Sequence, residues 1–349
     1  MDVKLLLTGA GGSASENFLD AVRLDKDLVS FTYGLDSSKF HIKLSTADKT
    51  FFVPRADNHE YLETIIKFID ELKIDVLHAQ PDIEVMELGK NRKKLDVGLF
   101  LPAQEELDVA ADKFKLNLVM KNSGIETPLS LDGNSEDEFS DSLSSLLRVV
   151  PKIWVRAKKG AGSKASLPVT SVDQGISWVK WWIEEREMHW SSFQCSEFLP
   201  GKEFALQTIW QDGVMKAAEA RERVEYLYGF LSPSGQSSTP SVARSTSKQE
   251  VFEIGVSAIR ALSSKPDGVY CVDMKTDFES RIKVTEINAG RFFTTSNFFA
   301  HAGVNMPAMS VRAALGENLD VIEPGSVPEG TYWIRMVDMG YKIVSEKDL

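Results

Sequence analysis

The chain has 349 residues, of which 43% are hydrophobic and 26% are charged, as in an ordinary globular protein with more than one packed core. Its formal net charge of −11 argues against a nucleic-acid-binding surface. No apolar run approaches the length of a membrane span, and the N-terminus does not resemble a signal peptide, so we expect no membrane partner. Two cysteines, Cys195 and Cys271, cannot form a disulfide framework, which favours a reducing, cytoplasmic location.

The first third of the chain alternates between strand and helix patterns. Strands are predicted at 3–8, 29–34, 50–53 and 75–79, and helices at 16–24 and 61–72. This alternation is typical of an open α/β domain with a largely parallel sheet, which we expect to end near residue 105. A glycine turn at residues 9–15 joins the first strand to the first helix. Ser15 replaces the third glycine of the dinucleotide-binding pattern, so we favour a tight turn without a dinucleotide.

The remaining chain contains predicted helices, strands and hairpins in mixed order. Helices are predicted at 112–123, 174–190, 251–262 and 306–315, strands at 152–156 and 193–198, and a hairpin at 202–210 and 214–220. Residues 231–246 are rich in Ser, Pro and Gly, which predicts a loop. This arrangement indicates an α+β region.

The segment 270–291 carries the most informative pattern. It reads as two strands joined by a short turn, with Asp273 on the first strand and Glu286 and Asn288 on the second. Because side chains alternate between faces, Glu286 and Asn288 point the same way. A turn centred near 278–279 places Asp273 opposite Val284, on the same face as Glu286 and one diagonal step away. Three oxygen ligands on a half-buried face are costly without a cation and suit Mg²⁺, so a metal site is predicted.

Three further motifs could bind a nucleotide or an anion, and each has a simpler explanation. Residues 156–166 could close over phosphates with glycine amides and lysines, or be a solvated basic hairpin tip. Residues 197–203 place two acids around a turn that could face adenine and ribose, or be an acidic surface turn. Arg221 and Arg223 could grip a carboxylate or phosphate at two points, or be exposed arginines.

Taken in chain order, these residues resemble the ATP-grasp superfamily, in particular the carbamoyl phosphate synthase large subunit and the carboxylate–amine ligases. The resemblance covers nearly the whole chain. It implies an α/β and α+β fold, with an open parallel-sheet, Rossmann-like pre-ATP-grasp domain at 1–105 followed by a two-subdomain ATP-grasp fold. The small subdomain with the phosphate lid would span 106–195, the large subdomain with the metal site 196–320, and a C-terminal extension 321–349.

The resemblance also implies a role for individual residues. The metal ligands would be Asp273, Glu286 and Asn288, holding Mg²⁺ or, as an alternative, Mn²⁺. The positions that match ATP contacts are Lys113, Arg156, Lys158, Ser163, Glu197, Phe198, Leu199 and Glu203. Arg291 and Arg156 would be catalytic, and Arg221, Arg223 and Arg291 would bind substrate. Ala289 and Gly290 place Arg291 one residue further from Asn288 than in the family pattern, so acceptor chemistry is expected to differ there.

The expected function is that of an ATP-dependent ligase that activates a carboxylate as an acyl phosphate and joins it to an amine. Phosphorylation of bicarbonate or carbamate is one alternative, and a non-catalytic ATP-binding module is another. A further alternative, an NAD-dependent dehydrogenase, is supported only by the first glycine turn. The expected partners are a small-molecule carboxylate and amine, and a homodimer is possible.

Overall fold

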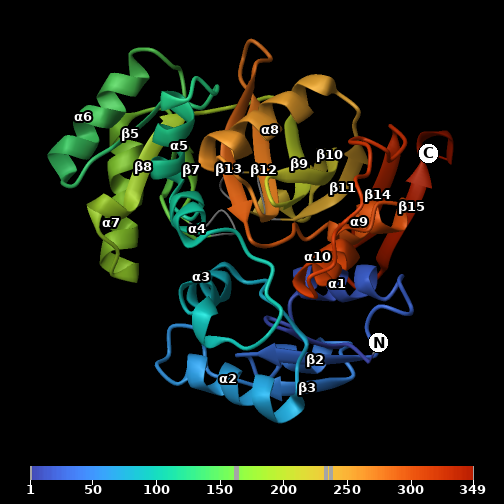
Figure 1. The fold of residues 1–349 in the computed structure, drawn as a ribbon. Helices are drawn as coiled ribbons and strands as arrows, with labels where there is room; N and C mark the ends of the chain where they lie inside the picture. Colours follow the sequence, from blue (N-terminus) through green and yellow to red (C-terminus); the bar gives the residue numbers. More distant parts are fainter. Residues whose placement is uncertain (1, 161–164, 232–234, 236–238, 349) are drawn as a thin grey trace.

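The computed structural model describes residues 2–160, 165–231, 235 and 239–348, and Figure 1 shows their arrangement. Three sheets organise this part of the chain. The N-terminal unit is a four-stranded parallel sheet in the order β3-β2-β1-β4, as the alternating pattern predicts. Its strands are β1 (Lys4–Leu7), β2 (Phe31–Asp36), β3 (Lys49–Phe52) and β4 (Val76–His78). Its helices are α1 (Ser13–Val22), α2 (Tyr61–Leu72), α3 (Asp82–Lys90) and α4 (Gln104–Ala110).

The glycine turn between β1 and α1 packs tightly. An added Cβ on Gly9 would lie 2.4 Å from a side-chain carbon of Pro81, and one on Gly11 would lie 2.3 Å from the backbone of His41. The amide of Gly11 donates to Asp36 at 2.9 Å. These contacts leave no room for a side chain at Gly9 or Gly11, which explains both glycines without a bound ligand.

Glu84 is a buried acid beside this turn, and we expect it to make stability depend on pH. Burial, and to a lesser extent the nearby Asp36 carboxylate, raise the pKa of Glu84 from 4.5 to about 7. The folded chain then holds a proton that the unfolded chain releases, so the free energy of unfolding falls as pH rises from about 4.5 to about 7. Relative to Glu84→Gln, we expect a loss of up to about 3 kcal/mol over this window.

Chemical denaturation at a series of pH values measures this difference. Glu63→Gln, which alters an exposed acid on α2, is the matched control and should follow the wild-type curve. Parallel curves for the wild type and Glu84→Gln would contradict the prediction.

The second unit is a small antiparallel sheet in the order β5-β8-β6-β7. Its strands are β5 (Ser130–Asp132), β6 (Ile153–Ala157), β7 (Leu167–Val169) and β8 (Phe193–Glu197). The neighbouring helices are α5 (Lys113–Asn122), α6 (Glu136–Leu147) and α7 (Val172–Arg186). The Asp112 side chain accepts hydrogen bonds from the amides of Phe114 and Lys115 and so caps α5. The helix predicted at 174–190 ends earlier, because Glu187 adopts a left-handed conformation.

The third unit is a seven-stranded antiparallel sheet in the order β13-β12-β9-β10-β11-β14-β15. Its strands are β9 (Glu203–Gln211), β10 (Val214–Tyr226), β11 (Pro240–Ser245), β12 (Gly268–Thr276), β13 (Ile282–Ala289), β14 (Thr331–Met336) and β15 (Gly340–Ser345). Its helices are α8 (Gln249–Leu262), α9 (Ser296–His301) and α10 (Met306–Ala314). One face packs against α8 and the other against α10, while α9 packs on α1 (Figure 1).

One prediction about this sheet needs correction. The segment 231–246 is not a loop throughout, because β11 occupies its last third and pairs with both β10 and β14. Strand pairing satisfies the backbone of this Ser- and Pro-containing segment, which sequence preference alone does not reveal. The stretch 321–349 contains β14 and β15, which extend the large sheet.

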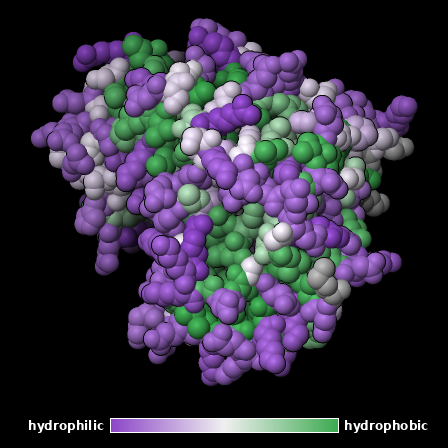
Figure 2. All heavy atoms as spheres, viewed as in Figure 1, coloured by the Kyte–Doolittle hydropathy of each residue, from purple (hydrophilic) through white to green (hydrophobic). Residues whose placement is uncertain are grey.

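The exposed face seen in Figure 2 is mostly hydrophilic, with hydrophobic residues gathered in places, including the middle of the N-terminal unit. In the described part of the chain, no helix combines the length and apolarity needed to cross a membrane.

Candidate active site

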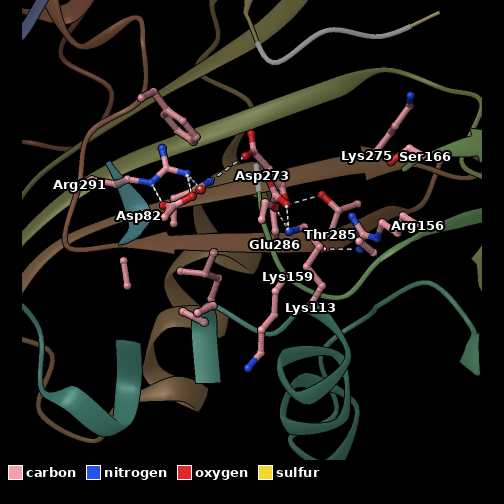
Figure 3. Close-up of a pocket in the computed structure, with 18 of the residues that line it drawn as sticks. Asp82, Lys113, Arg156, Lys159, Ser166, Asp273, Lys275, Thr285, Glu286 and Arg291 are labelled. Atoms are coloured by element: carbon pink, nitrogen blue, oxygen red, sulfur yellow. Dashed lines mark hydrogen bonds and ion pairs between the residues drawn. The ribbon is translucent and has the colours of Figure 1, made fainter. Parts of the chain in front are cut away.

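A cavity of ≈ 930 Å³ lies where the small sheet, the large sheet and α3–α5 meet. It is lined by residues of β6, β8 and the segment 159–160 on one side and by residues of β10, β12 and β13 on the other. Figure 3 shows Asp273 and Glu286 near its middle, with Arg291 and Asp82 towards one end and Lys113 and Arg156 towards the other.

A β-bulge at Thr285 determines how the candidate metal ligands meet. Asp273 pairs directly with Glu286, and the next pair is Met274 with Val284. The predicted pairing of Asp273 with Val284 is therefore wrong. That prediction assumed a regular hairpin, whereas this hairpin has one extra residue, Thr285, on its second strand. The bulge brings the two carboxylates directly opposite each other on one face. Asn288 donates from its amide nitrogen to Asp273 Oδ2 at 3.0 Å, so all three predicted metal ligands lie together.

The pKa values of the two facing carboxylates are shifted in opposite directions. Burial, and then repulsion by Glu286, raise the pKa of Asp273 to about 7. Burial also acts to raise the pKa of Glu286, but Lys113, Arg156 and Arg291 outweigh it and leave that pKa at about 2. Asp273 Oδ1 is buried and has no hydrogen-bond partner. A cation between the two groups would relieve both the repulsion and the unpaired oxygen.

Two cations from separate elements reach the Glu286 side of this pair. Lys113 Nζ, at the start of α5, lies 3.5 Å from Glu286 Oε2 and donates to the Gly160 carbonyl at 2.7 Å. Arg156 on β6 donates to the Thr285 carbonyl at 3.1 Å, so the bulge connects the small sheet to the large one. Burial lowers the pKa of Arg156, and the Glu286 carboxylate opposes that shift.

Cross-strand partners form two rows of side chains on the cavity face of the large sheet. The first row is Arg221, Ala205, Asp273 and Glu286, and the second is Arg223, Glu203, Lys275 and Lys283. Within the second row, Arg223 Nη1 lies 2.6 Å from Glu203 Oε1, and Tyr226 donates to the other oxygen of Glu203. Burial would lower the pKa of Arg223, but the Glu203 and Asp273 carboxylates outweigh it and raise the pKa above its usual range.

Glu197 and its neighbours line the far end of the cavity from Arg291. Ser196, Glu197, Phe198 and Leu199 all contribute to the wall. The Glu197 carboxylate accepts from Lys283 at 2.7 Å, and Lys283 Nζ also lies 3.5 Å from Asp277. All three charged groups are buried. This end of the wall is therefore fixed by charge pairing between the two sheets.

Lys283→Met is expected to lower the free energy of unfolding by about 3–5 kcal/mol, because two buried carboxylates lose their shared cation. Lys265→Met removes an exposed pair with Asp212 and should cost at most about 1 kcal/mol. Denaturant titration of both variants measures the difference. Equal, small losses would show that the buried pair contributes little.

The residues of the predicted phosphate lid lie in different places. Lys158 does not line the cavity and pairs with Asp132 at 2.7 Å. Lys159 and Gly160 line the cavity instead, as does Ser166. Ser163 falls outside the described residues.

Arg291 meets an acidic residue of the N-terminal unit. Its guanidinium forms a two-point ion pair with Asp82, at the first position of α3, with Nη2 3.2 Å from Oδ2. The same Nη2 donates to Asn288 Oδ1. An amide oxygen has two lone pairs, so Asn288 can accept from Arg291 and still bind a cation.

The chain after Arg291 is held by the end of β4. Gln80 donates to the Phe292 carbonyl at 2.8 Å, and His78 is hydrogen-bonded to the Gln80 side chain at 3.0 Å. The His78 ring stacks on Phe18 with 3.7 Å between centroids, and burial lowers the pKa of His78 to about 4. A neutral imidazole thus supports Gln80, and Gln80 supports the backbone beside Arg291.

Sequence reasoning missed Lys275, Lys283 and the pairing role of Asp82. Lys275 follows Asp273 by two residues, so strand alternation alone would have placed it on the cavity face. Lys283 precedes Glu286 by three residues, so alternation puts it on the opposite face, and only the bulge reverses this. No signal in the sequence links Asp82 to Arg291, 209 residues away.

Among the described residues, no group of three or more His, Cys, Asp or Glu side chains is arranged to hold a metal ion. The candidate trio differs from such a group because its third member is the amide of Asn288.

No family model matches the sequence, and no curated protein matches it either. Solved structures match the fold over most of the chain. The N5-carboxyaminoimidazole synthetase of Staphylococcus aureus in complex with ADP has a TM-score of 0.72 at 13% identity, covering 96% of this chain and 83% of that one. A biotin carboxylase of Campylobacter jejuni has a TM-score of 0.71 at 14% identity, covering 95% and 75%. The chain has the ATP-grasp fold.

A third protein with the ATP-grasp fold, the L-amino acid ligase of Bacillus licheniformis, has a TM-score of 0.68 at 14% identity and covers 95% of this chain and 79% of that one. The predicted fold class, with an open parallel sheet preceding the ATP-grasp sheets, is therefore confirmed.

Proposed function

We propose that this protein is an ATP-dependent ligase that activates a carboxylate as an acyl phosphate and joins it to an amine, with release of ADP and phosphate. The observation that carries the proposal is the facing pair of Asp273 and Glu286, with Asn288 beside it and cations on both sides within one cavity. The similar structures described above are named as synthetases, carboxylases and ligases, and one holds ADP, which supports the same reading.

The chemistry of the donor set fits Mg²⁺, with Mn²⁺ as a possible substitute. Asp273, Glu286 and Asn288 would hold the ion, and the unpartnered Asp273 Oδ1 is available to it. Bound there, Mg²⁺ would neutralise charge that develops on phosphate oxygens. Lys113 and Arg156, which already face Glu286, would stabilise the same charge from the protein side.

We assign ATP to the part of the cavity between the small and large sheets. The adenine would lie against Glu197, Phe198 and Leu199, and Glu203 would accept from the ribose hydroxyls. Lys158 and Ser163 stay assigned to the lid over the phosphates. Because Lys158 now pairs with Asp132, that role requires it to exchange partners when ATP binds.

The proposed reaction has two balanced steps. An oxygen of the substrate carboxylate attacks the γ-phosphorus of ATP, the bond to the β-phosphate oxygen breaks, and ADP leaves. The amine nitrogen then attacks the acyl carbon, phosphate departs with its bonding electron pair, and the nitrogen loses a proton to solvent. Arg291 would orient the carboxylate and stabilise the negative charge on the acyl oxygen.

A hydroxylamine trap tests the proposal. With Mg²⁺, ATP and a panel of carboxylic acids, at least one acid should yield its hydroxamate together with one ADP. Hydroxamate must depend on all three components. ATP binding without ADP release for any acid would instead indicate a nucleotide-binding module without turnover.

Bicarbonate is a second candidate for the activated acid. A 2-oxoglutarate carboxylase biotin carboxylase domain with MgADP and bicarbonate is among the similar structures, at 13% identity and a TM-score of 0.71. ADP formation that depends on bicarbonate and requires no amine would favour this reaction. We also propose a reducing, cytoplasmic location, on the basis of the two free, buried cysteines. A homodimer stays a prediction that solution mass measurement can test.

A further inference from the structure

Arg221 is a buried cation on the cavity wall. Its side chain is only 1% exposed, and Nε donates to Thr295 Oγ1 at 2.9 Å. The guanidinium lies over the Phe293 ring, 4.9 Å from its centroid. Nη1 is buried and has no hydrogen-bond partner. Two contacts thus fix the guanidinium in position and leave one of its donor groups unused.

Arg221 has no ion-pair partner in the described part of the chain, and the Asp273 and Glu203 carboxylates act on it only from beyond ion-pair distance. Arg223 pairs with Glu203, and Arg291 pairs with Asp82, but no described carboxylate forms an ion pair with Arg221. A buried charge without a counter-ion is strongly unfavourable. Burial and the nearby Arg223 lower the pKa of Arg221 to about 10, which still leaves it protonated at neutral pH. The site therefore retains a positive charge and a free donor with which an anionic ligand could pair directly.

Arg221 and Arg291 lie near the same end of the cavity but come from different elements. The Arg221 guanidinium lies over the ring of Phe293, and Phe293 follows Arg291 by two residues. Arg221 on β10 is two strands from Asp273 on β12, roughly 10 Å between strand axes. Arg291 contacts Asn288 and already holds one carboxylate, that of Asp82. The cavity thus offers one cation beside the metal ligands and another further from them.

We propose that Arg221 forms a second anion subsite, so that the acid substrate is a dianion. The reacting carboxylate would take the place of Asp82 on Arg291, and the distal carboxylate or phosphate of the same molecule would pair with Arg221. This inference rests on the proposed ligase function and adds the class of its substrate. Arg223, whose charge Glu203 neutralises, would support the wall without binding the distal group.

Matched acids that differ by one distal anionic group test the inference. Succinate and glutarate are compared with butyrate and valerate, and phosphoglycolate with glycolate, in the hydroxylamine trap with Mg²⁺ and ATP. At least one dianion should exceed its monoanionic match tenfold or more in kcat/KM. Arg221→Gln should remove that preference by lowering kcat/KM at least tenfold more for the dianion than for its monoanionic match. The pair that shows the effect distinguishes a distal carboxylate from a distal phosphate.

Two further variants keep the test interpretable. Arg221→Lys retains the charge and should retain part of the preference, which guards against simple misfolding of Arg221→Gln. Arg244→Gln alters an arginine on the neighbouring strand that pairs with Glu222 and does not line the cavity, so it should behave as wild type.

Distinct results separate the two proposals. Equal loss for all acids in Arg221→Gln would place Arg221 on the transferred phosphoryl group or the reacting carboxylate and overturn the dianion assignment. A preference for monoanions would also overturn it, while hydroxamate formation would still uphold the ligase function. Absence of hydroxamate with every acid would reject both.

Discussion

Glu286→Gln and Asp273→Asn are each expected to lower Mg²⁺-dependent kcat on the order of a hundred- to a thousandfold. Each removes one charge from the pair that would hold the ion and so leaves the transferred phosphoryl charge less stabilised. Glu279→Gln, at the exposed turn of the same hairpin, is the matched control and should retain activity. Steady-state ADP release with varied Mg²⁺ measures the effect.

Of these two variants, Asp273→Asn should have an opposite effect on stability without metal. Asp273 carries a raised pKa because it is buried against Glu286, so its negative charge opposes folding. Asp273→Asn should therefore unfold at a higher temperature than the wild type when Mg²⁺ is absent. Added Mg²⁺ should stabilise the wild type and have little effect on the variant. Unchanged activity in both carboxylate variants would remove these residues from the site.

Arg291→Met and Asp82→Asn are expected to act in opposite directions. Loss of the Arg291 guanidinium removes the group that would orient the carboxylate, and should lower kcat/KM on the order of a hundredfold or more. Asp82 pairs with that guanidinium in the structure. Asp82→Asn removes an internal competitor with a negative charge, so the KM for the acid should fall several-fold.

Kinetics with varied acid at saturating ATP measure both effects. The KM for ATP serves as the internal control, because Asp82 lies at the end of the cavity away from the proposed adenine pocket (Figure 3). A higher KM for the acid in Asp82→Asn would show that Asp82 assists substrate binding instead of competing with it.

Local patterns predicted the elements of this site better than its pairings. Period-two alternation placed Glu286 and Asn288 on one face, and helical spacing gave α2 its observed limits. The bulge at Thr285 has no sequence signal, so the register of Asp273 and the face of Lys283 were missed. β11 was missed because its pairing partners, β10 and β14, supply stability that its own composition does not indicate.

Charge pairing between distant segments was the other feature of the site that the sequence did not predict. The sequence indicated that Arg221, Arg223 and Arg291 could each bind an anion. It did not indicate which of them would bind which anionic group. In the structure, Glu203 pairs with Arg223 and Asp82 pairs with Arg291. These ion pairs are what distinguish the three arginines from one another. Such pairings depend on how separate units pack, which local spacing does not encode.

The hydrogen bond from Gln80 to the Phe292 carbonyl has a consequence for how this architecture can diversify. The residues that would bind ATP lie on the two antiparallel sheets, the segments that follow their strands and the start of α5, whereas the position of Arg291 depends on the end of β4 and the first turn of α3. Exchanging the N-terminal sheet for one from another protein should therefore change which acid is accepted and leave nucleotide affinity intact. The β4–α3 junction is where new acid preferences could be selected at the least risk to phosphoryl transfer.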